Sequence, residues 1–151
     1  MNKLMKSMMM MCALMLLMIG IAQPATAKAA TLQDGTYTLP FTVLHASKDQ
    51  PSKMNDYFVS PGTLKVKDGK KFVSFKVKSS NLVTAIQFER NGVMVDATVL
   101  STNTAENTRV VEFEVGDLST LLKGKVTIKI PVINYYSTYD IRMSFDTSNI
   151  Q

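Results

Sequence analysis

The stretch Leu64-Lys-Val-Lys-Asp-Gly-Lys-Lys-Phe-Val-Ser-Phe-Lys-Val77 carries the clearest structural signal in the chain. Apolar and polar side chains alternate on both sides of Asp68-Gly69. The apolar positions are Leu64, Val66, Val73, Phe75 and Val77. A period of two is typical of a half-buried β-strand. Asp-Gly between two such runs favours a tight hairpin, because both residues tolerate a positive φ. The stretch therefore predicts two antiparallel strands.

The same alternation continues through most of the chain from Tyr37 onward. Asn91-Gly92 repeats the turn signal between the apolar runs 82–88 and 93–100. Further strands are expected over residues 37–45, 111–115, 126–130 and 141–145. About eight short strands, with turn signals roughly every ten residues, are typical of an antiparallel sandwich or barrel. The sequence therefore predicts an all-β fold.

Two stretches interrupt the strand pattern. The connection 47–61 is long for a sandwich loop, and its segment Pro51–Tyr57 can form a short helix with Pro51 at the first helical position. Residues 118–122 can form one helical turn. Long ordered loops carry function more often than short ones, so the first stretch is the candidate functional loop.

The first 29 residues have the pattern of a secretory signal peptide. Lys3 and Lys6 precede an apolar run from Met8 to Ile21, and small residues suited to cleavage follow between Ala27 and Ala30. A retained membrane anchor is the alternative, but the run is short of the roughly 20 residues that span a bilayer. We therefore expect a signal peptide over 1–29 and one domain over 30–151.

Removal of that peptide changes the composition. About 121 residues remain, with 14 basic and 12 acidic side chains and no cysteine. So small a positive charge gives no argument for nucleic-acid binding. Absence of cysteine excludes disulfides, thiolate metal sites and thiol nucleophiles from this part. No apolar segment follows Phe145, so we expect a secreted, extracellular protein that is not attached to a membrane.

Residues suited to catalysis are scarce. His45 is the only histidine, and it continues the alternating face of its strand, as a structural or surface residue would. One histidine without cysteine cannot assemble the usual zinc sites. The chain has no nucleophile-elbow motif and no glycine-rich phosphate loop. We therefore do not expect an enzyme.

The last strand region, residues 133–146, carries an unusual group of tyrosines. Alternation places Tyr135 and Tyr139 on its apolar side and Tyr136 on the other side. Residues four apart on an extended strand are about 13 Å apart. Both phenols can act on one ligand only if the chain turns or bulges near residues 134–138.

Two interpretations of these tyrosines stay open. They can be amphipathic residues at the edge of the core. They can also line a pocket for a flat apolar ligand that carries a hard metal, since tyrosine phenolate is a known axial ligand of haem iron. A second hydroxyl nearby would then orient the first. With no cysteine and one histidine in the mature chain, tyrosine is the most plausible haem ligand left.

These residues resemble a known family. Tyr135-x-x-x-Tyr139, followed by Asp-Ile-Arg-Met-Ser-Phe, resembles the last-hairpin signature of NEAT (near iron transporter) domains. The stretch Ser52–Tyr57 is similar to the lip helix of that family. The resemblance covers about residues 33–148, and the architecture is similar to a secreted single-domain hemophore of the Bacillus type.

The resemblance implies an immunoglobulin-like β-sandwich holding one haem b (iron protoporphyrin IX) between the short helix and the last hairpin. It implies that Tyr135 is the axial iron ligand and that Tyr139 is its hydrogen-bond partner. Ser52 would bind a haem propionate, and Met54 would cover the distal face without a firm iron bond. Tyr57 would either pack on the ring or anchor the loop to the core.

The function implied is that of a hemophore. Such a protein takes haem from host hemoglobin and passes it to a cell-wall NEAT-domain acceptor. The alternative is a non-enzymatic extracellular sandwich for adhesion or carbohydrate binding, in which Tyr135, Tyr136 and Tyr139 form a stacking patch. That alternative predicts no Soret absorbance on mixing with haemin.

Overall fold

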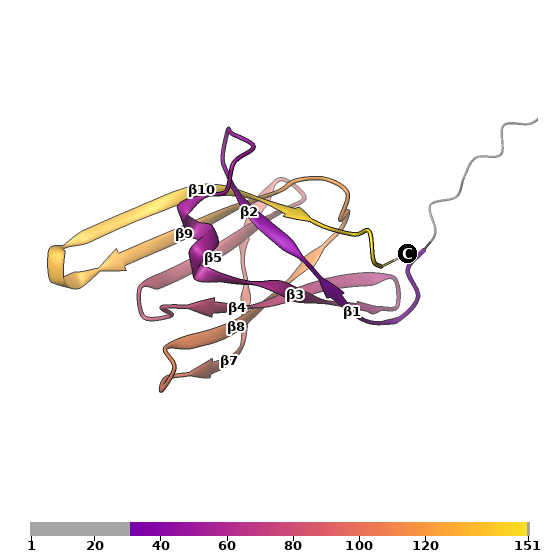
Figure 1. Cartoon of the computed structure of the whole chain (residues 1–151), viewed down its shortest axis with the longest axis horizontal. Helices are drawn as coiled ribbons and strands as arrows, with labels where there is room; N and C mark the ends of the chain where they lie inside the picture. Colours follow the sequence, from indigo (N-terminus) through magenta and orange to yellow (C-terminus); the bar gives the residue numbers. More distant parts are fainter. Residues whose placement is uncertain (1–30, 151) are drawn as a thin grey trace, which may run out of the picture.

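Two five-stranded antiparallel sheets pack face to face in the computed structural model, which describes residues 31–150 (Figure 1). The first sheet has the order β1 (Gly35–Leu39), β3 (Phe58–Lys67), β4 (Lys70–Lys78), β8 (Thr108–Val115) and β7 (Thr98–Asn103). The second has the order β2 (Phe41–His45), β10 (Tyr135–Phe145), β9 (Leu122–Ile130), β5 (Val83–Arg90) and β6 (Val93–Asp96). The predicted all-β sandwich is confirmed.

The structure has ten strands among the described residues, where about eight were expected, because two expected strands each contribute to both sheets. The run 37–45 divides at Pro40 into β1, which pairs with β3, and β2, which pairs with β10. The run 93–100 divides at Ala97 into β6 and β7 in the same way. Inward alternation continues across Pro40, with Leu39 and Phe41 both buried, so the pattern does not reveal the crossing.

The hairpin turns follow the prediction. Asp68 and Gly69 have φ values of 52° and 76°, and Asn91 and Gly92 have 51° and 79°. Positive φ at both central residues is the conformation that matches the twist of the flanking strands. Lys67 consequently lies directly opposite Lys70 in the β3–β4 pair.

Side chains from the inner faces of both sheets form the core. Phe75 lies at its centre, with four phenylalanine rings around it at centroid distances of 4.8 to 6.4 Å. Those rings belong to Phe41, Phe58, Phe88 and Phe113. Aromatic burial of this kind supplies much of the stability of a domain without disulfides.

The helical predictions have mixed outcomes. A 3₁₀ helix, η2, spans Lys53–Tyr57, so the short helix in the first long loop is confirmed. Pro51 is not part of it, because Pro51 forms a β-bridge with Leu44 and Ser52 is the N-cap. The helical turn expected at 118–122 is wrong: these residues form a bend that buries Leu118 and leads into β9.

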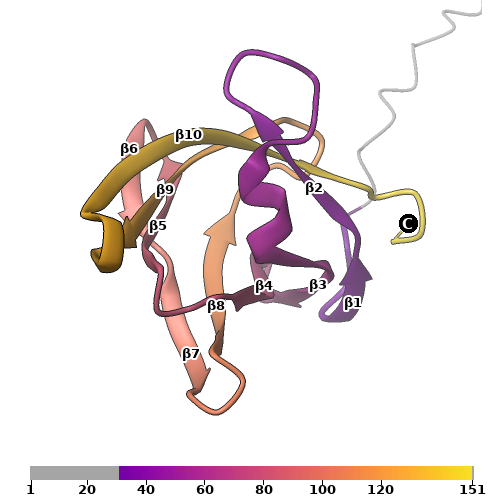
Figure 2. The same ribbon diagram turned by 60° about the vertical axis from the view of Figure 1, so that its left-hand side comes forward.

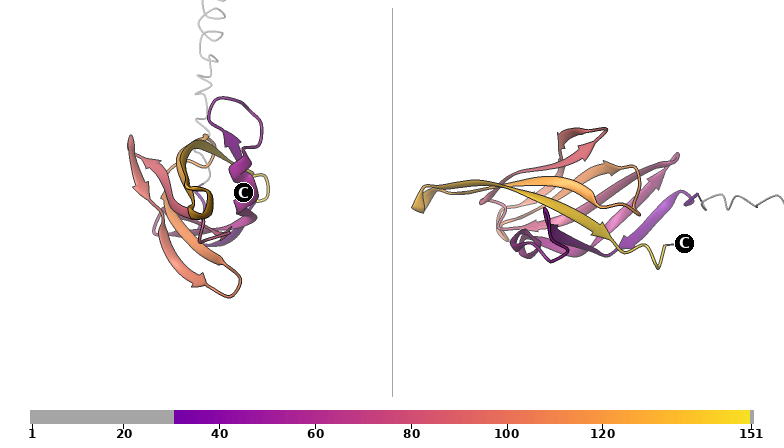
Figure 3. Two further views of the ribbon diagram at one scale, coloured as in Figure 1. Left: turned by 90° about the vertical axis from the view of Figure 1, so that its left-hand side faces the viewer. Right: turned by 90° about the horizontal axis from the view of Figure 1, so that it is seen from above.

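One end of the sandwich is shaped by η2 and the last hairpin. The helix connects β2 in the second sheet with β3 in the first, and β10 arches over the same end (Figure 2). The β9–β10 hairpin extends beyond the other strands (Figure 3). Its connection is a second 3₁₀ helix, η3, over Pro131–Ile133.

The signal peptide expected over residues 1–29 lies outside the described residues. Within residues 31–150, no helix has the length and apolar character needed to cross a membrane.

Candidate functional site

Backbone groups on the free edge of β2 hold η2 in place. Val43 donates its N–H to Asn55 Oδ1 at 2.9 Å, and its carbonyl accepts from the Ser52 N–H at 2.8 Å. Ser52 Oγ in turn accepts from the Met54 N–H at 3.1 Å, as an N-cap does. Because β2 is an edge strand of its sheet, the helix satisfies polar groups that no other strand reaches.

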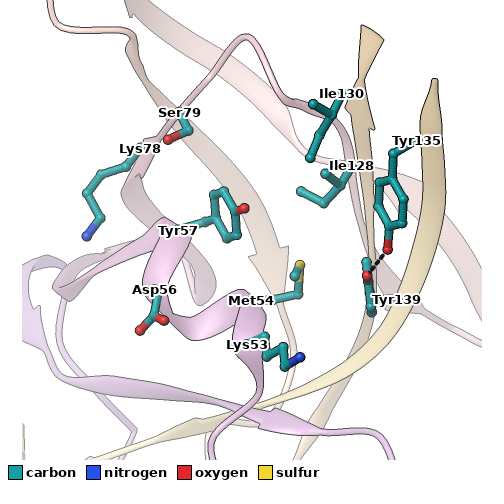
Figure 4. Close-up of a pocket in the computed structure, with 10 residues that line it drawn as sticks. All are labelled: Lys53, Met54, Asp56, Tyr57, Lys78, Ser79, Ile128, Ile130, Tyr135 and Tyr139. Carbon is teal, nitrogen blue, oxygen red and sulfur yellow. Dashed lines mark hydrogen bonds between the residues drawn. The ribbon is translucent and has the colours of Figure 1, made fainter. Parts of the chain in front are cut away.

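The last hairpin presents two tyrosines to this helix. Asn134 has φ 49° and ends η3 just before β10 begins at Tyr135. From Tyr135 to Met143, β10 pairs with β9 without a register shift. Of the turn or bulge expected near residues 134–138, the structure has the turn at Asn134, and no bulge interrupts the paired strand between Tyr135 and Tyr139. Instead, the side chains of Tyr135 and Tyr139 converge along the strand and their hydroxyls form a hydrogen bond (Figure 4).

A cavity of about 750 Å³ separates η2 from the last hairpin. Met54 and Tyr57 lie on the helix side and the tyrosine pair on the hairpin side (Figure 4). The full lining is Lys53, Met54, Asp56, Tyr57, Lys78, Ser79, Ile128, Ile130, Tyr135 and Tyr139. Its volume is within the range of about 300–1,000 Å³ that is common for small-molecule and cofactor sites.

The two phenols differ in acidity. The hydrogen bond from Tyr139 lowers the pKa of Tyr135, with further lowering by the Ser137 hydroxyl and by the positive charge of Lys53. The same hydrogen bond raises the pKa of Tyr139, which gives its proton to the shared contact, and partial desolvation raises it further. Tyr135 is consequently the first of the pair to ionise, and Tyr139 is the one that stays a proton donor.

The structure brings together three of the four predicted site residues. Met54, Tyr135 and Tyr139 line the cavity, whereas Ser52 lies at the start of η2 outside its lining. Tyr136 points away and is 69% exposed, so the three tyrosines do not form one stacking surface.

Several lining residues were not predicted as part of the site. Ile128 and Ile130 belong to the expected strand 126–130, where alternation could have placed them on the same face as each other. Lys78 and Ser79 come from the end of β4 in the other sheet. No sequence spacing connects these two residues to the last hairpin.

The donor chemistry of the cavity suits a hard metal held in a flat apolar group. Within the described residues there is no cluster of three or more His, Cys, Asp or Glu side chains that could hold a metal ion. His45 is exposed at the end of β2, outside the cavity lining. Met54 lies across the cavity from the phenol pair, whereas Ile128 and Ile130 of β9 lie beside the pair on the hairpin wall (Figure 4). Phenol oxygens next to apolar side chains are a combination that fits ferric haem.

Comparison with known proteins agrees with this geometry. The NEAT family model, described as an iron transport-associated domain, matches residues 30–147. Hemin/hemoglobin-binding protein 2 of Listeria monocytogenes is 41% identical over 130 residues, which are 85% of this chain and 23% of that protein. Hemin/hemoglobin-binding protein 1 of the same organism is 39% identical over 123 residues, covering 80% of this chain and 57% of that protein. The chain thus spans less than two thirds of either relative.

A solved structure matches over the whole of its own length. The NEAT5 domain of IsdX2, a B. anthracis hemophore in complex with heme, superposes with a TM-score of 0.76 at 45% identity. The match covers 78% of this chain and 100% of that domain.

Proposed function

This chain belongs to the NEAT family of iron transport-associated domains, and we propose that it binds ferric haem in the cavity between η2 and the last hairpin. The observation that carries the proposal is the hydrogen-bonded pair Tyr135–Tyr139 on the wall of a cavity that is also lined by apolar side chains of η2 and β9. The printed names of the relatives, which describe hemin, hemoglobin and heme binding, support it.

Tyr135 is the proposed iron ligand. Its lowered pKa makes the phenolate easier to form, and a phenolate is a hard donor suited to ferric iron. Tyr139 keeps its proton and donates it to the Tyr135 oxygen, which fixes the orientation of that ring. A single protein–iron bond also suits a carrier, because only one bond has to be exchanged when the cargo is passed on.

Residues of η2 are proposed to hold the rest of the molecule. Met54 covers the ring from the helix side, and Tyr57 packs beside it. The Ser52 hydroxyl accepts from the Met54 N–H, so its own proton is free to donate to a propionate carboxylate. The positive charge of Lys53 at the cavity favours the same acid groups.

The physiological role that we propose is that of a secreted hemophore for haem b. It takes haem from host hemoglobin, passes it to a cell-wall NEAT-domain acceptor and catalyses no reaction. Two features support this role: the signal-peptide pattern of residues 1–29 and the similarity to a domain whose description includes the word hemophore.

Replacement of Tyr135 by Phe tests the site. The wild-type domain mixed with haemin should show a Soret band near 400 nm and keep it through gel filtration, and Tyr135→Phe should lose most of it. Tyr136→Phe is the matched control, because that ring lies on the opposite face of the same strand. An unchanged Soret band in Tyr135→Phe would show that the ligand is another residue.

A further inference from the structure

The tip of the β9–β10 hairpin exposes apolar side chains that the haem site does not use. Val132, Ile133 and Tyr136 are the three most exposed large apolar or aromatic side chains among residues 31–150, at 94%, 67% and 69% exposure. They belong to η3 and to the start of β10, where the hairpin extends beyond the other strands (Figure 3). Exposed apolar side chains that lie together, unlike scattered ones, indicate a contact with another surface.

The backbone holds this tip in one conformation. Pro131 is the first residue of η3, and Asn134 ends the helix in the left-handed region with φ 49°. The Asn134 N–H donates to the Pro131 carbonyl at 3.1 Å. The exposure of Val132 is therefore a property of a hydrogen-bonded turn that projects its side chains away from both sheets.

The charge around the tip is positive. No acidic residue occurs between Asp117 and Asp140, a segment that contains three lysines. Lys129 is the lysine nearest to the tip, and it lies directly opposite Tyr136, so both side chains project from the outer face of the hairpin. Lys129 forms no ion pair among the described residues, whereas Lys125 pairs with Asp140 at 3.3 Å. An apolar tip is thus followed directly by a tyrosine and an unpaired ammonium group.

The order of these groups along the hairpin favours a lipid bilayer as the partner. Aliphatic side chains at the end can enter the acyl region, while a tyrosine ring and a lysine behind them suit the level of the headgroups. A stable protein interface uses about 20–30 residues on each side, whereas this convex tip offers three large apolar side chains. We propose that the tip inserts reversibly into an anionic phospholipid bilayer and lets the cavity take up haem that is dissolved there.

The cavity begins directly behind the tip. Ile130 and Tyr135, which flank the tip residues 131–134, lie directly opposite each other and both line the cavity. Haem is a flat, largely apolar molecule and dissolves in bilayers. Insertion of the tip brings this end of the cavity to the bilayer surface, so haem can enter without crossing water. The uptake step rests on the proposed haem-binding function, whereas the membrane contact does not. A reversible contact is also compatible with a secreted protein.

Other charges near the cavity do not oppose this approach. The lining contains Lys53 and Lys78 against a single acidic residue, Asp56, and all three lie outside the hairpin. The charge of the lining is therefore positive as well. Basic residues close to an anionic bilayer add to the attraction within about a Debye length.

The test compares two double variants that each remove two exposed aliphatic side chains. Val132→Ser with Ile133→Ser changes the tip, and Val93→Ser with Val99→Ser, on β6 and β7, is the matched control. Co-sedimentation of the apo domain with vesicles of equal parts phosphatidylcholine and phosphatidylglycerol measures membrane contact without haem. Growth of the Soret band measures haem uptake from haemin-loaded vesicles and, separately, from methemoglobin. Thermal unfolding shows whether each variant is folded.

We expect the wild-type domain and the control to sediment with the vesicles. The tip variant should bind them at least tenfold more weakly, since each buried methylene group contributes roughly a factor of four to partitioning. Wild-type binding should be weaker to vesicles of phosphatidylcholine alone, because Lys129 then has no anionic headgroups to attract it. Uptake from haemin-loaded vesicles should slow in the tip variant, and uptake from methemoglobin should stay unchanged.

Two outcomes would overturn the membrane contact: no sedimentation of the wild-type domain with either kind of vesicle, or an equal loss of binding in both double variants. Normal vesicle binding by the tip variant, combined with slower uptake from methemoglobin, would assign the tip to a protein partner instead. Sedimentation of the wild-type domain without a Soret band from either source would refute the haem site and support the membrane contact alone.

Discussion

Replacement of Asn55 by Ala should loosen the helix that covers the site. Asn55 Oδ1 accepts from the Val43 N–H at 2.9 Å, and Val43 is fully buried on the edge strand β2. The alanine variant leaves this N–H without its partner. The same change frees one attachment of η2, which carries Met54 and Tyr57 on the wall of the cavity.

The size of the effect follows from the burial of Val43. A buried donor left without an acceptor costs about 1–3 kcal/mol. A domain of the 120 described residues has an unfolding entropy of about 0.25 kcal/mol/K at roughly 2.1 cal/mol/K per residue. The expected loss in Tm is therefore about 4–12 °C, and haem dissociation should become faster because η2 is less well positioned.

Three measurements check this reasoning. Circular dichroism gives the Tm, amide hydrogen exchange follows the Val43 N–H, and transfer to excess apomyoglobin gives the rate of haem loss. Asn55→Asp is the control, because it keeps an acceptor oxygen in the same place and should retain most of the stability. A Tm for Asn55→Ala within 1 °C of the wild type, together with a still-protected Val43 amide, would refute the proposed anchoring role.

Two further predictions concern the tyrosine pair and the close packing of Gly124 in β9. Replacement of Tyr139 by Phe removes the main cause of the lowered pKa of Tyr135, so the pKa of Tyr135 should rise toward its ordinary value. The phenolate then forms less readily at a given pH. In a pH titration of the Soret band, the pH below which ferric haem is lost should therefore move upward. In Gly124→Ala, the new Cβ would lie 2.8 Å from the Gln87 carbonyl oxygen and 2.9 Å from the Phe88 ring. We expect about 1–3 kcal/mol of destabilisation in urea unfolding, with the haem spectrum of the folded fraction unchanged. An unshifted pH midpoint in Tyr139→Phe would contradict the role of Tyr139 in lowering the pKa of Tyr135. An unchanged free energy of unfolding in Gly124→Ala would contradict the close packing at Gly124.

Local pattern was sufficient for the strands and for the direction of the tyrosines. Alternation along the last strand correctly placed Tyr135 and Tyr139 on one side and Tyr136 on the other, because successive side chains of a strand point to opposite faces. The turn or bulge expected near residues 134–138 is a turn at Asn134, ahead of both tyrosines. The separation of about 13 Å applies to backbone positions, whereas two long side chains can converge on a regularly paired strand.

The alternation of apolar and polar residues could not predict which strands pair with each other. Alternation has the same period in both sheets, so Pro40 and Ala97 did not reveal that the chain crosses from one sheet to the other there. Those crossings account for ten strands where about eight were expected, and the first of them makes β2 the edge strand that anchors η2.

The sequence alone therefore specified an all-β domain, its Asp-Gly and Asn-Gly turns and two tyrosines on a common face, since each depends on residues close together in the chain. Tertiary structure was needed to bring η2 to the free edge of β2 and to place Lys78 and Ser79 beside the last hairpin. It was also needed to join the Tyr135 and Tyr139 hydroxyls in a hydrogen bond that makes one phenol more acidic than the other. Such contacts depend on how two sheets pack and on how side chains lean, and residue spacing along the chain encodes neither.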